Sequence, residues 1–170
     1  MIENSYAAIL SHDTLKIKHP ASKRGEQSVE LKRIIATKSF NLYDKFGNVI
    51  ISVQKYDIGG FVESIDNLDP DNPVWVDHSA RIFDNAKLLD GSYARNNALL
   101  YESAIASKSI LAGHCRVHGT AIVHNSTIQD LTEVKDSAYI TDSCISNNSK
   151  VYENAQIVNS QLLKAASAHG

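Results

Sequence analysis

Hydrophobic and polar positions after Val76 recur with a period of about seventeen residues. The chain divides there into five segments, the first of 18 residues and the others of 17: 76–93, 94–110, 111–127, 128–144 and 145–161. The eleventh position of every segment is alanine: Ala86, Ala104, Ala121, Ala138 and Ala155. The seventh position is always aliphatic: Ile82, Leu100, Val117, Val134 and Val151. Self-similarity at a fixed period indicates a repeat architecture.

Each segment divides into three parts, in which an aliphatic residue is followed two places later by a turn-prone residue and four places later by a small one. Most of the turn-prone positions hold Asp, Asn or Gly, which tolerate a left-handed backbone or bond their own main chain. They include Asp84, Asp90, Asn96, Gly113, Gly119, Asn125, Asp130, Asp136, Asp142, Asn147 and Asn159. Three short strands separated by three corners form one coil of a triangular prism. The pattern therefore predicts an all-β fold, a parallel β-helix of five coils stacked ~4.8 Å apart.

Other fold classes fit this spacing less well. No window keeps the i, i+3, i+4, i+7 pattern of a helix, and simple two-residue alternation does not place alanine at every seventeenth residue. The unit aliphatic-x-x-x-small-x resembles the hexapeptide repeat of left-handed β-helix proteins, and it covers residues 76–161, about half of the chain. That resemblance, and not the spacing, implies the left-handed sense.

The segments on either side of the repeat are expected to cap it. Runs of β-branched residues at 29–40 and 41–56 predict strands, with a hairpin turn between them at 46–48. We expect residues 1–75 to form a small antiparallel β cap and a lead-in loop, because an uncapped β-helix exposes unpaired backbone groups at its first coil. Residues 162–170 are expected to form a C-terminal cap in which Leu162 and Leu163 fold over the last coil.

Glycine and proline punctuate the approach to the repeat. Gly59 and Gly60 predict a bulge or a close approach of two backbones. Residues 65–75 contain Pro70 and Pro73 and predict a loop that leads into the first coil.

A second resemblance concerns the entry to the repeat. The stretches LKRIIATKSF, KYDIGGFVES and NLDPDNPVWVDHSA are similar to the N-terminal part of the YdcK-like proteins, which are bacterial β-helix proteins of unassigned activity. This resemblance extends over about residues 31–161. It implies the fold and a bacterial or prophage context, and it brings no catalytic residues to transfer.

Composition narrows the function classes only slightly. Seventeen basic and nineteen acidic residues give a formal net charge of -2, so the totals carry no electrostatic footprint of nucleic-acid binding. No stretch approaches the ~18 to 20 apolar residues of a membrane span, and we expect a cytoplasmic protein without membrane contact. The first forty residues lean basic, at Lys16, Lys18, Lys23, Arg24, Lys32, Arg33 and Lys38. A solvated cap surface explains them better than a nucleic-acid patch, because aromatic residues are not interleaved with the charges.

Histidines and cysteines in the repeat supply the candidate chemistry. Many hexapeptide-repeat proteins are trimeric acyltransferases with a histidine base at a subunit boundary, and in that alternative His118 or His124 is the base. The coils contain no insertion that would shape an acyl-donor site. His114, Cys115, His118 and His124 share one coil but point in different directions, so no metal site or other cofactor is expected. Cys115 and Cys144 occupy different corner columns and are expected to be unpaired core residues.

The residues that point outward form the favoured binding surface, because stacking of the coils places every seventeenth residue side by side. The eighth position holds Phe83, Tyr101, His118, Lys135 and Tyr152. The twelfth position holds Lys87, Ile105, Ile122, Tyr139 and Gln156. These columns are either well-formed ladders or an interface for self-association or a protein partner. We expect a non-catalytic binding or assembly module, and the prophage context of the similar family favours an inhibitor of a host protein such as a defence component.

Overall fold

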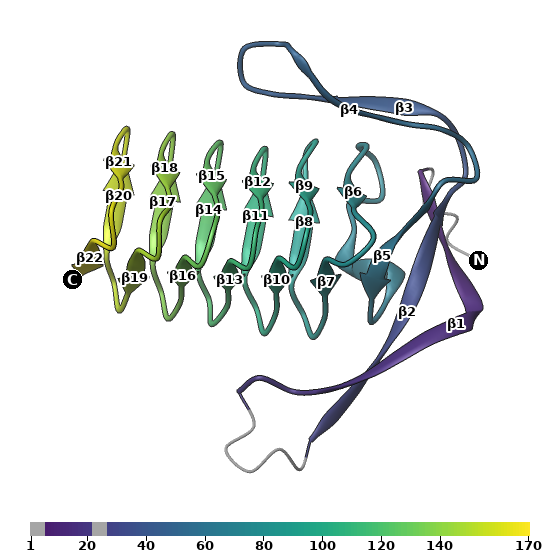
Figure 1. Cartoon of the computed structure of the whole chain (residues 1–170), viewed down its shortest axis with the longest axis horizontal. Helices are drawn as coiled ribbons and strands as arrows, with labels where there is room; N and C mark the ends of the chain where they lie inside the picture. The colour runs from purple at the N-terminus through teal and green to yellow at the C-terminus, as the bar shows by residue number, and fades with distance from the viewer. Residues whose placement is uncertain (1–5, 22–26) are drawn as a thin grey trace.

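Parallel strands stack into a three-sided solenoid in the computed structural model, which describes residues 6–21 and 27–170 (Figure 1). Face 1 contains β5 (Ile58–Val62), β7 (Arg81–Ile82), β10 (Leu99–Leu100), β13 (Arg116–Val117), β16 (Glu133–Val134), β19 (Lys150–Tyr152) and β22 (Ser167–His169). Face 2 contains β8 (Lys87–Leu89), β11 (Ile105–Ser107), β14 (Ile122–His124), β17 (Tyr139–Thr141) and β20 (Gln156–Val158). Face 3 contains β6 (Trp75–Val76), β9 (Tyr93–Ala94), β12 (Ile110–Leu111), β15 (Thr127–Ile128), β18 (Cys144–Ile145) and β21 (Gln161–Leu162).

The seventeen-residue period is the register of the solenoid. On face 2, Ile105 pairs with Ile122, and Ile122 pairs with Tyr139. The alanines of the eleventh position are all buried, as are the aliphatic residues of the seventh. The prediction of an all-β parallel β-helix with its repeat columns inside is confirmed.

The corners have the backbone conformation that their residues predict. All of the turn-prone Asp, Asn and Gly positions named above have positive φ, between +45° at Asn125 and +72° at Gly119. Gly119 is required for a second reason, since a Cβ there would lie 2.7 Å from backbone atoms of Asp136 in the next coil. Glu102, Lys108 and Glu153 also have positive φ, although their residue types gave no sign of it. The coil period imposes that conformation on them.

A ladder of serines, buried at every member but the last, continues the coil-to-coil bonding across the corner between faces 2 and 3. Its members are seventeen residues apart: Ser92, Ser109, Ser126, Ser143 and Ser160. Each hydroxyl donates to a carbonyl of its own coil, as Ser126 Oγ does to His124 O at 2.7 Å. The same hydroxyl accepts a hydrogen bond from the amide of the serine in the next coil, as Ser126 Oγ does from Ser143 N at 3.0 Å. Side-chain hydroxyls thus satisfy backbone amides where the corner interrupts strand pairing.

The N-terminal cap is antiparallel, as predicted, but its strands pair differently. β1 (Ala7–Lys18) pairs with β2 (Ser28–Ala36), and β2 pairs with β5 at the start of face 1. The turn at 46–48 does not join the runs 29–40 and 41–56. It joins β3 (Phe40–Tyr43) to β4 (Val49–Val53), a separate two-stranded hairpin. The Asp44 carboxylate sets that turn by accepting the amides of Phe46 and Asn48.

Parallel pairing extends beyond the repeat at its N-terminal end. β5 pairs with β7, so a first coil forms from residues that lack the repeat pattern. The predicted loop at 65–75 contains the 3-10 turn η1 (Ile65–Asn67) and ends at the first residue of β6. The buried Asn67 amide donates to the carbonyls of Asp84 and Ala86, both at 2.9 Å, and so occupies backbone acceptors at the start of face 2.

Parallel pairing also reaches the C-terminal residues. The expected C-terminal cap is wrong, because Leu162 lies in β21 and residues 167–169 form β22 against β19. Lys164 and Ala165 have positive φ and turn the chain as the corner residues of earlier coils do. The segment therefore continues the coil and does not fold over it.

Gly59 and Gly60 are a close approach of two backbones, as predicted. A Cβ on Gly60 would lie 2.2 Å from the carbonyl oxygen of Asp77. No helix in the described part of the chain is long and apolar enough to cross a membrane.

Enlarging an inward alanine is expected to destabilise the solenoid. Ala121 is fully buried, so Ala121→Leu should lower the free energy of unfolding by ~1 to 3 kcal/mol through overpacking. Lys150 points outward and is exposed, so Lys150→Leu should change it by less than ~0.5 kcal/mol. Urea denaturation measures both, and equal losses would contradict the inward and outward assignments.

The serine ladder predicts a second pair of unequal effects. Ser126→Ala leaves the buried amide of Ser143 without its acceptor, which should cost ~1 to 3 kcal/mol of unfolding free energy. Ser160 is exposed at the last coil, and Ser160→Ala should cost well under ~1 kcal/mol. A Ser126→Ala protein as stable as the wild type would show that the ladder contributes nothing.

Candidate functional site

The outward column of face 1 begins as a stack of planar rings. The rings of Phe83 and Tyr101 have centroids 5.1 Å apart and planes 7° apart. The ring of Tyr101 stacks on that of His118 at 4.7 Å and 5°. Register at the coil spacing produces this stack, since each ring lies on the equivalent position of the next coil.

The N-terminal strands cover this stack, so it is not the exposed ladder that was expected. Phe83 is 0% exposed and Tyr101 is 3% exposed. They form an apolar cluster with Val29 and Leu31 of β2 and with Phe61 of β5. Sequence columns predicted their outward direction correctly, but the pairing of β1 and β2 over face 1 buries them. Burial raises the pKa of Tyr101 to about 12.

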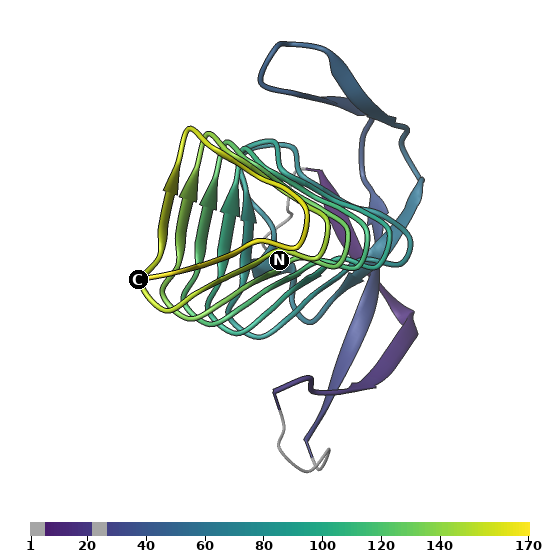
Figure 2. The same cartoon turned by 60° about the vertical axis from the view of Figure 1, so that its left-hand side comes forward.

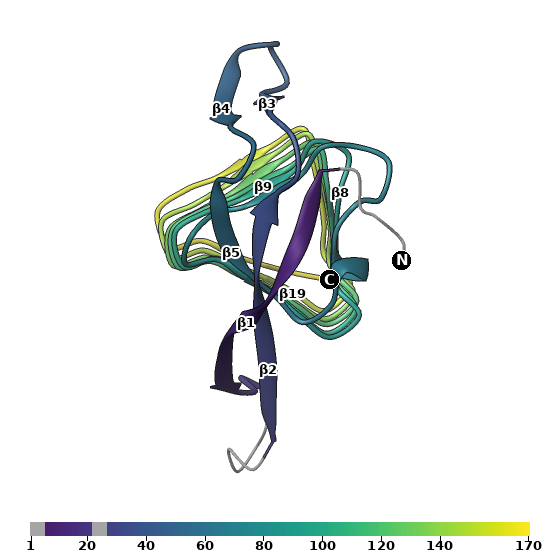
Figure 3. The same cartoon turned by 90° about the vertical axis from the view of Figure 1, so that its right-hand side faces the viewer.

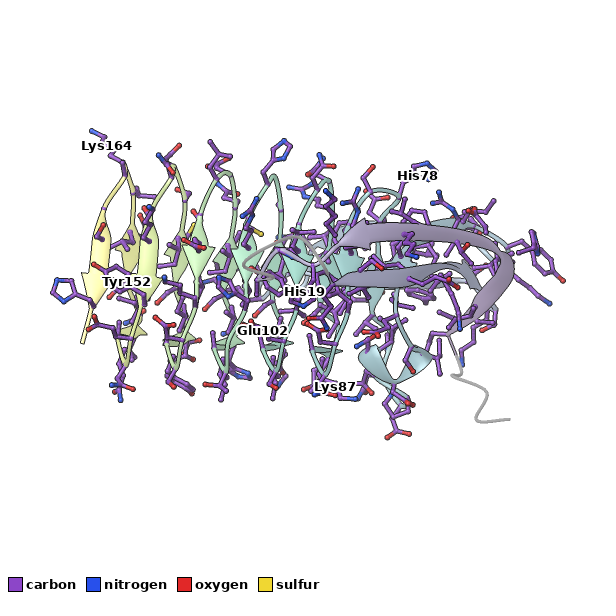
Figure 4. All side chains as sticks on the ribbon, turned by 90° about the horizontal axis from the view of Figure 1, so that it is seen from below. His19, His78, Lys87, Glu102, Tyr152 and Lys164 are labelled. Atoms are coloured by element: carbon purple, nitrogen blue, oxygen red, sulfur yellow. The ribbon has the colours of Figure 1, made fainter. Side chains whose placement is uncertain are left out.

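His19, which directly follows β1, packs against this stack (Figure 4). Its ring meets Phe83 and Tyr101 edge to face, at centroid distances of 5.6 and 5.9 Å. Nε2 lies 2.8 Å from Asp84 Oδ2, and Nδ1 accepts the amide of Ala21 at 3.1 Å. With Nδ1 acting as acceptor, the neutral ring carries its proton on Nε2 and donates it to Asp84.

Arg33 fastens β2 to the first coil. Its guanidinium donates to Asp13 Oδ2 at 2.5 Å and to the carbonyl of Gly59 at 2.9 Å. It also lies 4.1 Å from the centroid of the Phe61 ring. Of the basic N-terminal residues, Arg33 thus acts in packing, while Lys23 and Arg24 lie outside the described residues.

His118 is held by two carboxylates. Nδ1 lies 3.3 Å from Glu102 Oε2, and Nε2 lies 3.2 Å from Glu133 Oε1. With a ring face against Tyr101 and a carboxylate at each nitrogen, His118 has no free nitrogen to serve as a general base. The His118 form of the acyltransferase alternative therefore has no support in this geometry.

The remaining histidines and Cys115 of this coil do not converge. His114 is exposed at a corner, and His124 is half-buried on face 2. Cys115 is fully buried, and burial raises the pKa of its thiol to about 12, which disfavours the thiolate that metals bind. Within residues 6–21 and 27–170, no three His, Cys, Asp or Glu side chains are grouped to hold a metal ion.

Cys144 is not the core residue that was expected. It points outward on face 3 and is partly exposed, because it occupies the strand position next to the buried Ile145. Its column runs through Trp75, Tyr93, Ile110 and Thr127. The β3–β4 hairpin extends over this face, and a groove of about 280 Å³ lies between them, with Cys144 in its lining.

Two N-terminal arms extend from the solenoid, the β1–β2 arm and the β3–β4 hairpin, and neither of them covers face 2 (Figure 2). The predicted strip of Ile105, Ile122 and Tyr139 lies there in direct register. Ile122 is 38% exposed and Tyr139 is 39% exposed. The neighbouring outward column holds Leu89, Ser107, His124, Thr141 and Val158. Acidic side chains are thus absent from both columns of this face.

The last members of the outward column of face 1 lie beyond the part of the face that the β1–β2 arm covers. Tyr152 stacks on His169 at a centroid distance of 5.5 Å, and Lys135 Nζ lies 5.8 Å from the Tyr152 ring. Figure 4 shows Tyr152 well removed from His19 along the solenoid. The predicted interface residues therefore divide between covered positions on face 1, open positions at its far end, and the strip on face 2.

Three features were missed in the sequence. The serine ladder was readable, because Ser109, Ser126, Ser143 and Ser160 share one position of the repeat. The Arg33 and His19 contacts could not be predicted from the sequence, since they join residues 20 to 65 positions apart. The groove under the hairpin likewise depends on tertiary structure alone.

Comparison with known proteins adds no further identification. The chain matches no protein-family model and no curated protein.

Two tyrosines of the same column are expected to differ in their contribution to stability. Tyr101→Ala removes a buried ring from under the arm and should cost ~3 to 5 kcal/mol of unfolding free energy. Tyr152→Ala removes a half-buried ring at the open end and should cost about 1 kcal/mol or less. Thermal and urea unfolding test this, and similar losses would mean that the arm does not seal the stack.

Proposed function

We propose that the protein is a non-catalytic module that binds another protein through face 2. The observation that carries this proposal is the uncharged strip of Ile105, Ile122 and Tyr139 on the face that both arms leave open. Exposed apolar and tyrosine-containing patches are typical of protein interfaces. Coil-to-coil bonding holds these side chains in place before binding, which lowers the entropy lost on association.

The chemistry of face 2 favours a protein over other ligands. A flat surface suits a protein partner, whereas small molecules bind in concave pockets. Lys87 and His124 are the basic side chains of its two outward columns, and they are too few cations to neutralise a nucleic-acid backbone.

The size of face 2 favours a different protein over a second copy. Three residues at ~3.3 Å and five coils at ~4.8 Å give a flat area of roughly 250 Å². A stable interface buries about 800 Å² on each partner. A partner must therefore reach past the face onto the corners, which a second flat face of the same kind does not do.

The kind of target in this proposal rests on the resemblance to YdcK-like hexapeptide-repeat proteins. In this proposal the module is of bacterial or prophage origin and works in the cytoplasm, and its target is a host protein, such as a defence component that it inhibits. The regular solenoid register supports a hexapeptide-repeat β-helix, while the YdcK-like relationship depends on the N-terminal stretches quoted above.

Charge placed in the strip is expected to abolish target binding and leave the fold intact. Ile122→Asp puts an unpaired carboxylate at the centre of the contact and should weaken binding to the purified target at least about 30-fold. Leu131→Asp is the matched control, since Leu131 is 62% exposed on another part of the solenoid.

The target is obtained by affinity capture from bacterial extract, as a protein retained by wild type and by Leu131→Asp, and its dissociation constant is then measured calorimetrically. Equal affinities for wild type and Ile122→Asp would remove face 2 from the proposal. Unchanged circular dichroism of Ile122→Asp confirms that the loss is not one of folding.

A further inference from the structure

The two corners that border face 2 differ in what lies beside them. The corner between faces 2 and 3 carries Lys108 and Asn125, and the tip of the β3–β4 hairpin faces both across a groove of about 280 Å³. The corner between faces 1 and 2 meets the β1–β2 arm at its start, where His19 bonds to Asp84. Figure 3 shows the hairpin and the arm leaving the N-terminal end in opposite directions, with β8 of face 2 on a third side.

The later coils of the corner between faces 1 and 2 present an exposed, acidic surface. Their exposed side chains are Thr120, Asp136, Ser137, Glu153 and Asn154. Among the residues that the structure describes, no Lys, Arg or His side chain forms an ion pair with Asp136 or Glu153. The cation that precedes Asp136 in sequence, Lys135, lies over the Tyr152 ring on face 1. Both carboxylates therefore face solvent beside the apolar strip of face 2.

Charges on the opposite side of face 2 are balanced. Asp90 and Lys108 line one hollow beside the hairpin, and Asp142 and Lys45 line another. At the start of the face, Lys87 Nζ donates to the carbonyl of Asp66 at 2.5 Å. The uncompensated charge along face 2 is thus negative and lies on the side of face 1.

We propose that the partner of face 2 presents an apolar patch with Lys or Arg side chains along one edge, and that these cations lie over Asp136 and Glu153. This inference rests on the function proposed for face 2, and it adds the chemistry and the orientation of the partner. The apolar patch covers Ile105, Ile122 and Tyr139. Because the carboxylates border one side of this strip, the cations determine the direction in which the partner lies across the face.

The two parts of this surface contribute in different ways. An apolar centre with a polar rim is the usual anatomy of a protein interface. The apolar strip supplies affinity, since its burial removes hydrocarbon from water. Exposed rim charges are screened by solvent, so they act mainly on the rate of association and on the choice of partner. A protein with carboxylates along the same edge is repelled, and so is a nucleic-acid backbone.

Asp136 also has a structural role, which the test must separate from docking. Its Oδ2 accepts the amide of Glu153 in the next coil at 3.0 Å. Asp130 has the same role at the corner between faces 3 and 1, where its Oδ2 accepts the amide of Asn147 at 3.1 Å. The two aspartates are both exposed and have φ of +59° and +62°. Asp130 is therefore a matched control for the loss of a corner carboxylate.

The test measures how the affinity for the purified target of face 2 depends on charge and on salt. The double variant Asp136→Asn/Glu153→Gln should bind about 5-fold more weakly at low ionic strength, mainly through slower association, because it removes two exposed ion pairs. Asp130→Asn should leave the affinity unchanged. The dissociation constant of the wild type should rise between about 0.05 and 0.5 M salt, and the double variant should lose most of that dependence.

Two further variants leave the bond from the Glu153 amide to Asp136 in place. Glu153→Gln alone should weaken binding about 2-fold, and Glu153→Lys, which reverses the charge, should weaken it roughly 10-fold. Lysine suits this corner position, because Lys108 and Lys164 also have positive φ at corners. Equal unfolding free energies for the wild type and these variants confirm that the losses are not losses of folding.

Failure of this inference is distinguishable from failure of the proposed function. A captured target that binds Ile122→Asp as tightly as the wild type contradicts the function proposed for face 2. A target that requires Ile122 but binds the wild type and the double variant equally at every salt concentration contradicts the partner chemistry alone. Affinity that increases when Asp136 and Glu153 are neutralised contradicts it as well, because the edge of the partner would then be acidic.

Discussion

Backbone pairing between successive coils is the constraint on which this structure depends. Each short strand bonds to its equivalent one period later, so every coil must return to the same place after seventeen residues. That return places a left-handed residue at the corners from Asp84 onward, and it imposes this conformation even on Glu102, Lys108 and Glu153. The buried serines add bonds where the strands are interrupted. Inward alanines follow from the same geometry, because the corners leave room for little more than a methyl group.

The same pairing determines how the faces are used. The first coil offers free strand edges, and the N-terminal residues occupy them through β2 and the amide of Asn67. The β1–β2 arm then covers the first rings of face 1, and the β3–β4 hairpin extends over face 3. Face 2 is left open, and its two outward columns hold no acidic side chain. The N-terminal residues therefore both cap the first coil and determine which face stays open for binding.

Two histidines and a cysteine at or beneath face 1 serve packing. His19 and His118 each lie against an aromatic ring and face carboxylates, and the Cys115 thiol is kept protonated by burial. His118 and Cys115 are the two of these residues that the sequence offers as candidate catalytic or metal-binding groups. Their neighbours decide otherwise, because nitrogen atoms with bonded partners and a buried thiol are not free to react.

The amino-acid sequence by itself determined the solenoid. Alanine at every seventeenth residue and Asp, Asn or Gly at the corners are local requirements of the coil, so they can be read without coordinates. The sequence also predicted the strip of Ile105, Ile122 and Tyr139, since register follows from the period. Only the tertiary structure decided that Phe83 and Tyr101 are covered, that Cys144 lies in a groove and that residues 162–170 continue the coil. Those features depend on contacts between segments distant in sequence and outside the repeat, and no periodicity records which face such a segment will cover.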